Sequence, residues 1–256
     1  MKLVHFYLFG KSCWGALQDD GETLQLLEGN PFDGQLTPID RTLSLESVRL
    51  LPASSRPSKI VCIGSNYRLH CEEMGKPVPA VPILFMKPPS ALVAHGEAIR
   101  LPPELGRVDF EGELAVIIGR RARNLSRDAV AEHVLGYSIL NDVSARELQR
   151  SDGQFTRAKG FDTFCPLGPW IATDLDPHDL ELVTTHDGVV KQRSRTSDMV
   201  FPVFDLVAFI SRHMTLEPGD VISTGTPSGV SAIAPGDEVS ITIEGIGTLS
   251  NTVVPQ

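Results

Sequence analysis

Apolar and polar positions alternate in the segment VDFEGELAVIIG, which spans residues 108–119 and predicts a β-strand. Glu111 and Glu113 then point to the same side, and apolar residues fill most remaining positions on both faces. A strand that is apolar on both faces is typical of a buried position inside a sheet. The alternative is an edge strand on which both glutamates face solvent.

A second apolar segment, at residues 135–142, predicts another short strand that ends in Asn141 and Asp142. Buried carboxylates repel one another and lose hydration, so Glu111 and Glu113 require compensation by cations, protons or a metal. Together with Asp142 they form a set of oxygen ligands at strand ends. Such a set suits a hard divalent cation such as Mg²⁺, with positions left open for water and substrate.

Short strands separated by turn residues predict a small β unit at residues 1–55, with strands at residues 4–9, 13–17 and 24–27. The segment LLPASSRPSK follows and is rich in proline and serine, which predicts a linker. We therefore expect a small N-terminal β domain at residues 1–55 and a main domain at residues 56–256.

A short helix is predicted after the strand at residues 60–63, with Ser65 or Asn66 as its N-cap and Gly75 at its end. His70 and Glu73 then lie on one face of this helix. A histidine whose second ring nitrogen is held by a carboxylate is the arrangement of a general base. The alternative is an ordinary His–Glu pair on the surface.

Further helices are predicted at residues 125–134, with Ser126 as N-cap, and at residues 204–213, where the pattern is amphipathic. Ser144 and Glu147 have the spacing of a capping box, which would start another helix just after the second strand.

Three loops and one strand end carry candidate chemistry that the pattern alone leaves open. The proline-rich loop at residues 76–82 is either a lid or a surface connection. Lys87, at the end of a predicted strand at residues 83–87, is either structural or an anion contact. Lys159 lies in a glycine-flanked loop, where its charge could stabilise an oxyanion. The GTPSG segment at residues 225–229 either approaches an anion with its backbone N–H groups or simply forms a turn.

The composition is ordinary for a globular protein, with 41% hydrophobic and 21% charged residues among 256. The net charge is −9 without a basic cluster, so we expect neither nucleic acid nor a membrane as partner. None of the four cysteines belongs to a CxxC pair, which predicts free thiols. The apolar start is too short for a signal peptide, and we expect a cytoplasmic protein.

Six motifs, in this order, resemble those of the fumarylacetoacetate hydrolase family over roughly residues 58–256: GSNYRLHCEEMG, VDFEGELAVIIG, LNDVSARELQ, KGFDTFCPLGPW, RTSDMVFP and STGTPSGV. The resemblance implies an α+β fold, namely a mixed β-sheet roll with peripheral helices, usually assembled as a homodimer. Residues 1–55 look like the small N-terminal domain of many bacterial members.

The resemblance also implies roles for individual residues. Glu111, Glu113 and Asp142 match the family's ligands for a divalent metal, usually Mg²⁺ or Mn²⁺. His70 and Glu73 match a catalytic dyad of the short-form members, in which a flexible segment closes over the substrate.

Lys159 matches a lysine that contacts the substrate near the metal. The substrate-binding positions implied by the same motifs are Arg146, Gln149, Gly225 and Thr226. Ser65 departs from the larger residue that is common before Asn-Tyr, and this departure bears on the identity of the substrate.

The activity implied is C–C bond cleavage of a small anionic 2-oxo acid, similar to an acylpyruvate or fumarylacetoacetate, through an enolate that the metal and Lys159 stabilise. His70, oriented by Glu73, would move the proton. One alternative is an isomerase or decarboxylase of aromatic catabolism acting on a 2-hydroxyhepta-2,4-diene-1,7-dioate type of acid, and another is an oxaloacetate decarboxylase. The non-enzymatic alternative is an inactive metal- or ligand-binding module.

Overall fold

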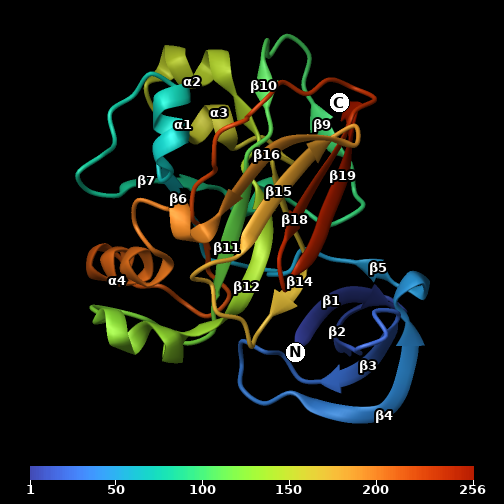
Figure 1. The fold of residues 1–256 in the computed structure, drawn as a ribbon. Helices are drawn as coiled ribbons and strands as arrows, with labels where there is room; N and C mark the ends of the chain where they lie inside the picture. The colour runs from blue at the N-terminus through green and yellow to red at the C-terminus, as the bar shows by residue number, and fades with distance from the viewer.

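The computed structural model describes residues 1–256 (Figure 1). A 12-stranded mixed sheet, a 5-stranded sheet and a 2-stranded ribbon form the body of the molecule, with a few helices at its periphery. The predicted α+β fold, a mixed β-sheet roll with peripheral helices, is confirmed. None of the helices combines the length and the apolar character needed to cross a membrane.

The strands are β1 (Lys2–Leu8), β2 (Lys11–Leu17), β3 (Thr23–Glu28), β4 (Thr37–Ser44), β5 (Arg49–Leu50), β6 (Ile60–Gly64), β7 (Ile83–Lys87), β8 (Leu92–Val93), β9 (Ile99–Leu101), β10 (Val108–Asp109), β11 (Gly112–Ile118), β12 (Val134–Asn141), β13 (Ser144–Ala145), β14 (Cys165–Ala172), β15 (Glu181–His186), β16 (Val189–Arg195), β17 (Val221–Ser223), β18 (Glu238–Ile243) and β19 (Gly247–Pro255). The α-helices are α1 (Arg68–Glu73), α2 (Arg146–Asp152), α3 (Thr156–Lys159) and α4 (Val203–His213). Short 3₁₀ helices span Leu45–Ser47, Pro89–Ala91, Arg127–His133 and Thr196–Asp198.

Strand β11 lies inside the large sheet, between β12 and β17, and every one of its residues is buried. Its apolar side chains divide between two core clusters, with Leu114 and Val116 in one and Ala115 and Ile117 in the other. The prediction of a buried strand is therefore confirmed, and the solvent-exposed edge strand is excluded. The predicted strand is interrupted before β11, where the side-chain oxygen of Asn141 accepts the N–H of Glu111 at 3.0 Å.

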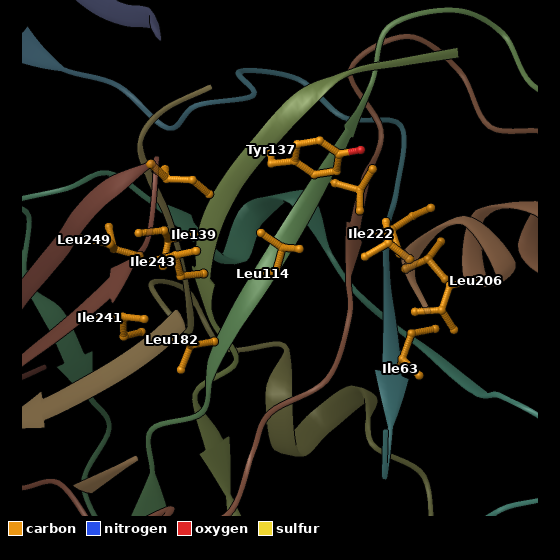
Figure 2. Packing of buried hydrophobic residues seen from close by; sticks show 14 of the residues in the cluster. Ile63, Leu114, Tyr137, Ile139, Leu182, Leu206, Ile222, Ile241, Ile243 and Leu249 are labelled. Atoms are coloured by element: carbon orange, nitrogen blue, oxygen red, sulfur yellow. The ribbon is translucent and has the colours of Figure 1, made fainter. Parts of the chain in front are cut away.

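The main core joins the two larger sheets across one face of β11 (Figure 2). Leu114 points into a layer where Ile241 and Ile243 of β18 lie on one side and Leu206 of α4 lies beyond Ile222 on the other. Residues of both larger sheets and of α4 therefore pack in the same cluster as Leu114, near the start of β11.

Residues 1–55 continue the large sheet, because β1 pairs with β14 in the register Lys2 to Ala172. Leu3 and Trp14 share a core cluster with Ile117 of the central strand β11. Strand β4 was not expected from the sequence, because most of its residues are exposed and no apolar alternation marks it. In Figure 1 this unit lies at the opposite side of the molecule from α1, α2 and α3.

The N-cap predicted for α1 is wrong. The helix begins after Tyr67, and no side chain caps it. Asn66 instead donates its side-chain amide to the carbonyls of Phe201 and Thr224, at 3.1 and 2.7 Å. Because the Asn66 amide is hydrogen-bonded to these two distant carbonyls, it does not cap α1.

Other local predictions are also wrong in detail. The helix expected at residues 125–134 is a 3₁₀ helix that Ser126 does not cap with its side chain. The predicted capping box at Ser144 is absent, because this hydroxyl donates to the carbonyl of Asp142 at 2.8 Å. Lys159 ends a short helix, α3, rather than lying in a loop. The amphipathic helix at residues 204–213 is confirmed as α4.

Candidate active site

Three carboxylates meet where β11 begins and β12 ends. The register pairs Gly112 with Asn141, which brings the adjacent Glu111, Glu113 and Asp142 together. One oxygen from each carboxylate lies within 4.8 Å of the others. Their residues are only 5%, 1% and 0% exposed, so water screens their mutual repulsion poorly.

Buried cations compensate two of the three carboxylates. The Nζ of Lys159 contacts Glu111 Oε2 at 2.9 Å and also donates to Asp142. Lys87 donates to Asp142 Oδ1 at 2.6 Å, and Arg146 Nη2 contacts Glu111 Oε1 at 2.6 Å. Burial opposes ionisation of Glu111, but Lys159 and Arg146 outweigh it and hold the pKa of Glu111 below its usual range.

Glu113 has no cation in contact. It accepts hydrogen bonds from the hydroxyl of Ser223 and from the N–H of Gly225, the latter at 2.8 Å. Burial, followed by the charges of Asp142 and Glu111, raises the pKa of Glu113 to about 8. An ionised Glu113 therefore has no side-chain cation in contact with it. An all-oxygen donor set of this kind fits a hard divalent cation.

His70 lies on α1 with its Nδ1 3.1 Å from Oε2 of Glu73. The other oxygen of Glu73 accepts the backbone N–H of Gly229 at 3.0 Å, which anchors the carboxylate. The His70 side chain is largely buried, and its Nε2 has no hydrogen-bond partner in the chain. The predicted pair is thus present, and its histidine lines the same pocket as Glu111.

Gly225 and Thr226 form hydrogen bonds with residues at the start of β11. Thr226 donates its hydroxyl to the carbonyl of Gly112 at 3.0 Å and accepts from Gln192 Nε2 at 2.8 Å. A side chain at Gly225 would come within 2.7 Å of Asn66, so the turn requires glycine there. The Thr226 hydroxyl is therefore engaged inside the chain, beside the pocket.

One pocket gathers most of the predicted site residues. Its walls include the aromatic rings of Phe85 and Phe155, which meet edge to face at 5.2 Å. Lys159 Nζ lies 4.7 Å from the centre of the Phe85 ring. The predicted residues that line the pocket are His70, Glu111, Glu113, Arg146, Gln149, Lys159 and Thr226, while Glu73, Asp142 and Gly225 contact members of this set from behind.

The sequence did not decide the role of Lys87 and gave no indication that Gln192 belongs to the site. Lys87 is fully buried and holds Asp142 together with the carbonyl of Val143, at 3.1 Å. Gln192 accepts the N–H of Gly112 at 3.0 Å while it donates to Thr226, so it joins β16 to the start of β11. The only signal for Gln192 is that it is the sole buried residue of β16, and that becomes visible only in the fold.

Comparison with known proteins gives a consistent result. Residues 59–254 match the family described as fumarylacetoacetate (FAA) hydrolase C-terminal, and residues 1–52 match Rv2993c-like, N-terminal. Protein Rv2993c from Mycobacterium tuberculosis is 52% identical over 94% of this chain and 91% of its own length. Oxaloacetate tautomerase FAHD2A, mitochondrial, from Bos taurus is 43% identical over 83% of this chain and 71% of its own. The crystal structure of 5-carboxymethyl-2-hydroxymuconate delta-isomerase from Mycobacterium smegmatis is 46% identical with a TM-score of 0.93, covering 100% of both chains.

Proposed function

The chain belongs to the fumarylacetoacetate hydrolase family, and we propose that it is a divalent-metal-dependent enzyme that moves a proton at the carbon next to the 2-oxo group of a small anionic acid. The observation that carries this proposal is that His70, held by Glu73, borders the same pocket as Glu111, Glu113 and Lys159. A base and a cluster of anion-stabilising groups around one pocket suit enolate formation.

Glu111, Glu113 and Asp142 would hold Mg²⁺ or Mn²⁺, because their oxygens converge and Glu113 lacks a cation of its own. A bound cation would supply Lewis-acid polarisation of the 2-oxo group.

His70 acts as the base. Nδ1 donates its hydrogen to Glu73, so Nε2 carries the lone pair that takes a proton from C3 of the substrate. Glu73 stabilises the imidazolium that results, and the same Nε2 returns the proton. Lys159 adds positive charge where the enolate oxygen develops, and burial lowers its pKa less than Asp142 and Glu111 raise it, so it stays protonated.

Tautomerisation or double-bond isomerisation requires these proton transfers alone. The names of two relatives, a tautomerase and a delta-isomerase, support this reaction class for the present chain. The proton leaves one atom of the substrate and is returned to another, with no co-reactant.

The C–C hydrolase expected from the sequence is the second candidate. It would use the same base, because His70, held by a Glu73 carboxylate that is engaged at both oxygens, could also take a proton from water. Water would add to a 4-oxo group, and the bond between C3 and C4 would break to leave a pyruvate enolate and a carboxylic acid. Decarboxylation of oxaloacetate would begin from the same contacts.

A product-resolved assay tests the proposal. Metal-stripped protein is mixed with the enol form of oxaloacetate, with a 2-hydroxy-dienedioate and with an acylpyruvate, each with and without Mg²⁺. We expect metal-dependent tautomerisation or isomerisation without fragments, and loss of turnover in His70→Ala with metal binding retained. Pyruvate from the acylpyruvate would favour the hydrolase instead. No metal-dependent turnover of any of the three acids would contradict the proposal and favour a binding module.

A homodimer and a cytoplasmic location belong to the same proposal. Exposed apolar side chains on and beside the edge strand β7, at Val81, Ile83 and Met86, support an interface between two copies. Four free cysteines support a reducing compartment. Light scattering that gave the mass of a monomer would contradict the dimer.

A further inference from the structure

The pocket runs from a buried charged floor to an exposed rim. Glu113 and Lys159 at the floor are almost inaccessible to solvent, whereas Lys76 at the rim is exposed. The rings of Phe85 and Phe155 are half-buried and belong to the wall of the same pocket. A ligand that enters the pocket would thus meet a charged end, an apolar wall and a lysine at the rim.

The cations of the floor are already engaged by carboxylates. Lys159 contacts Glu111 and Asp142. The guanidinium of Arg146 contacts Asp109 at 2.7 Å and Glu111 at 2.6 Å. A second carboxylate of a substrate would therefore find no side-chain cation there that is free of an ion pair.

Lys76 is different, because it lines the pocket without forming an ion pair in the chain. Among the lysines and arginines of the pocket, it alone has its full charge available to a ligand. The ammonium of Lys76 is exposed and unpaired, so it can contact a carboxylate of a ligand without first breaking an ion pair.

The backbone of Lys76 is fixed by the end of helix α1. Gly75 takes a φ of +62°, and the N–H of Lys76 donates to the carbonyl of Cys71 at 2.8 Å. This is the Schellman pattern of a helix terminus, in which a glycine in the left-handed region reverses the chain. The turn that ends the helix bearing His70 therefore also sets Lys76 at the pocket rim.

We propose that Lys76 forms a second anion subsite, which binds the distal carboxylate of a dicarboxylic 2-oxo acid while the 2-oxo end lies at the carboxylate floor. This inference rests on the proposed function and adds the substrate class to it. The chain selects dicarboxylic over monocarboxylic 2-oxo acids, and Lys76 determines that selectivity.

Matched ligands test the proposal by calorimetry on the Mg²⁺-loaded protein. 2-Oxoadipate and 2-oxohexanoate have the same chain length and differ in a carboxylate or a methyl group at C6, and 2-oxoglutarate and 2-oxopentanoate form a shorter pair. Wild type should bind the diacid of at least one pair more tightly. Lys76→Met should weaken binding of that diacid by about tenfold, or about 1.4 kcal/mol, and leave the monoacid unchanged.

Three further variants distinguish the effect of the charge at residue 76 from a general effect of substitution on the protein. Lys76→Arg should retain the preference for the diacid, and Lys76→Glu should reverse it. Lys11→Met removes an exposed lysine of β2, so it changes the net charge equally and should not alter the preference. These differences should shrink with added salt.

The outcomes separate the two proposals. Equal binding of diacid and monoacid to wild type, or an unchanged ratio in Lys76→Met, would overturn the role of Lys76 while 2-oxo acid binding stands. Failure of all four acids to bind wild type would overturn the proposed function, and the subsite with it.

Discussion

Glu113 distinguishes the cluster of Glu111, Glu113 and Asp142 from a network in which every carboxylate is paired with a cation. Its neighbours Glu111 and Asp142 are matched by buried lysine and arginine side chains, whereas Glu113 meets only a hydroxyl and a backbone N–H. A carboxylate in that position either holds a proton or shares a bound cation. If the three carboxylates hold a cation as proposed, we expect Glu113 to couple its binding to pH.

We predict that Mg²⁺ affinity rises with pH up to about 8, the raised pKa of Glu113, and levels off above it. Below this pH the cation must displace a proton, so affinity should fall by about tenfold per pH unit. Calorimetry in buffers of different ionisation enthalpy would count that proton, with Glu113→Gln as the variant that cannot release it. A flat affinity between pH 6.5 and 8.5 in the wild type would disprove the coupling.

At the residue scale, sequence reasoning found the side chains with chemical character but not their partners. Lys87 lies 55 residues from Asp142, and Gln192 lies 80 residues from Gly112. Such contacts depend on strand order and register, which local patterns do not encode. The family motifs supplied the candidate set, and the fold places most of its members around one pocket and the rest in contact with them.

At the scale of elements, the start of β11 packs unusually closely against the second sheet. A side chain at Gly112 would overlap the hydroxyl of Thr184 on β15 and lie 3.1 Å from the side-chain oxygen of Gln192 on β16. Glycine between the two glutamates thus allows the two sheets to meet directly behind the carboxylates.

Gly112→Ala should therefore lower the free energy of unfolding by about 1–3 kcal/mol, the usual cost of overpacking a buried site. Urea unfolding measures it. Gly64→Ala is the control, because its added methyl would meet no atom nearer than 3.6 Å. Equal free energies of unfolding for the two variants would show that Thr184 and its neighbours move to accommodate the methyl group at little cost.

Helices and strands were predicted correctly where burial produces a hydrophobic periodicity. Strands without that periodicity and helix caps that depend on one hydrogen bond were not. The buried β11 and the amphipathic α4 follow from hydrophobic periodicity. The exposed β4 carries no such pattern, and the expected caps at Asn66 and Ser144 were lost to competing partners. A cap depends on which acceptor the fold brings nearest, so sequence alone gives only candidates.

At the scale of the whole molecule, residues 1–55 share both a sheet and a core cluster with the rest of the chain. Strand β1 pairs with β14, and Leu3 and Trp14 share one core cluster with Ile117. A smaller cluster of buried residues lies wholly within residues 1–55, and the half-buried Trp170 of β14 packs against it. Since these parts support one another, they should unfold together.

We predict a single unfolding transition in urea. Trp14 fluorescence, isolated in a Trp170→Phe variant, should have the same midpoint as far-UV circular dichroism of the whole chain. Leu3→Ala should lower both midpoints equally. Loss of the Trp14 signal at lower urea than the ellipticity would mean that residues 1–55 unfold independently.

If this site forms the enolate of a 2-oxo acid, it should exchange the protons at C3 of that acid with solvent. NMR in D₂O would follow the C3 protons of 2-oxoadipate with protein and Mg²⁺, independently of any later reaction. We expect metal-dependent exchange that falls at least about 100-fold in His70→Ala, the usual contribution of a general base. Exchange at the uncatalysed rate with the wild type, or equal exchange with His70→Ala, would contradict it.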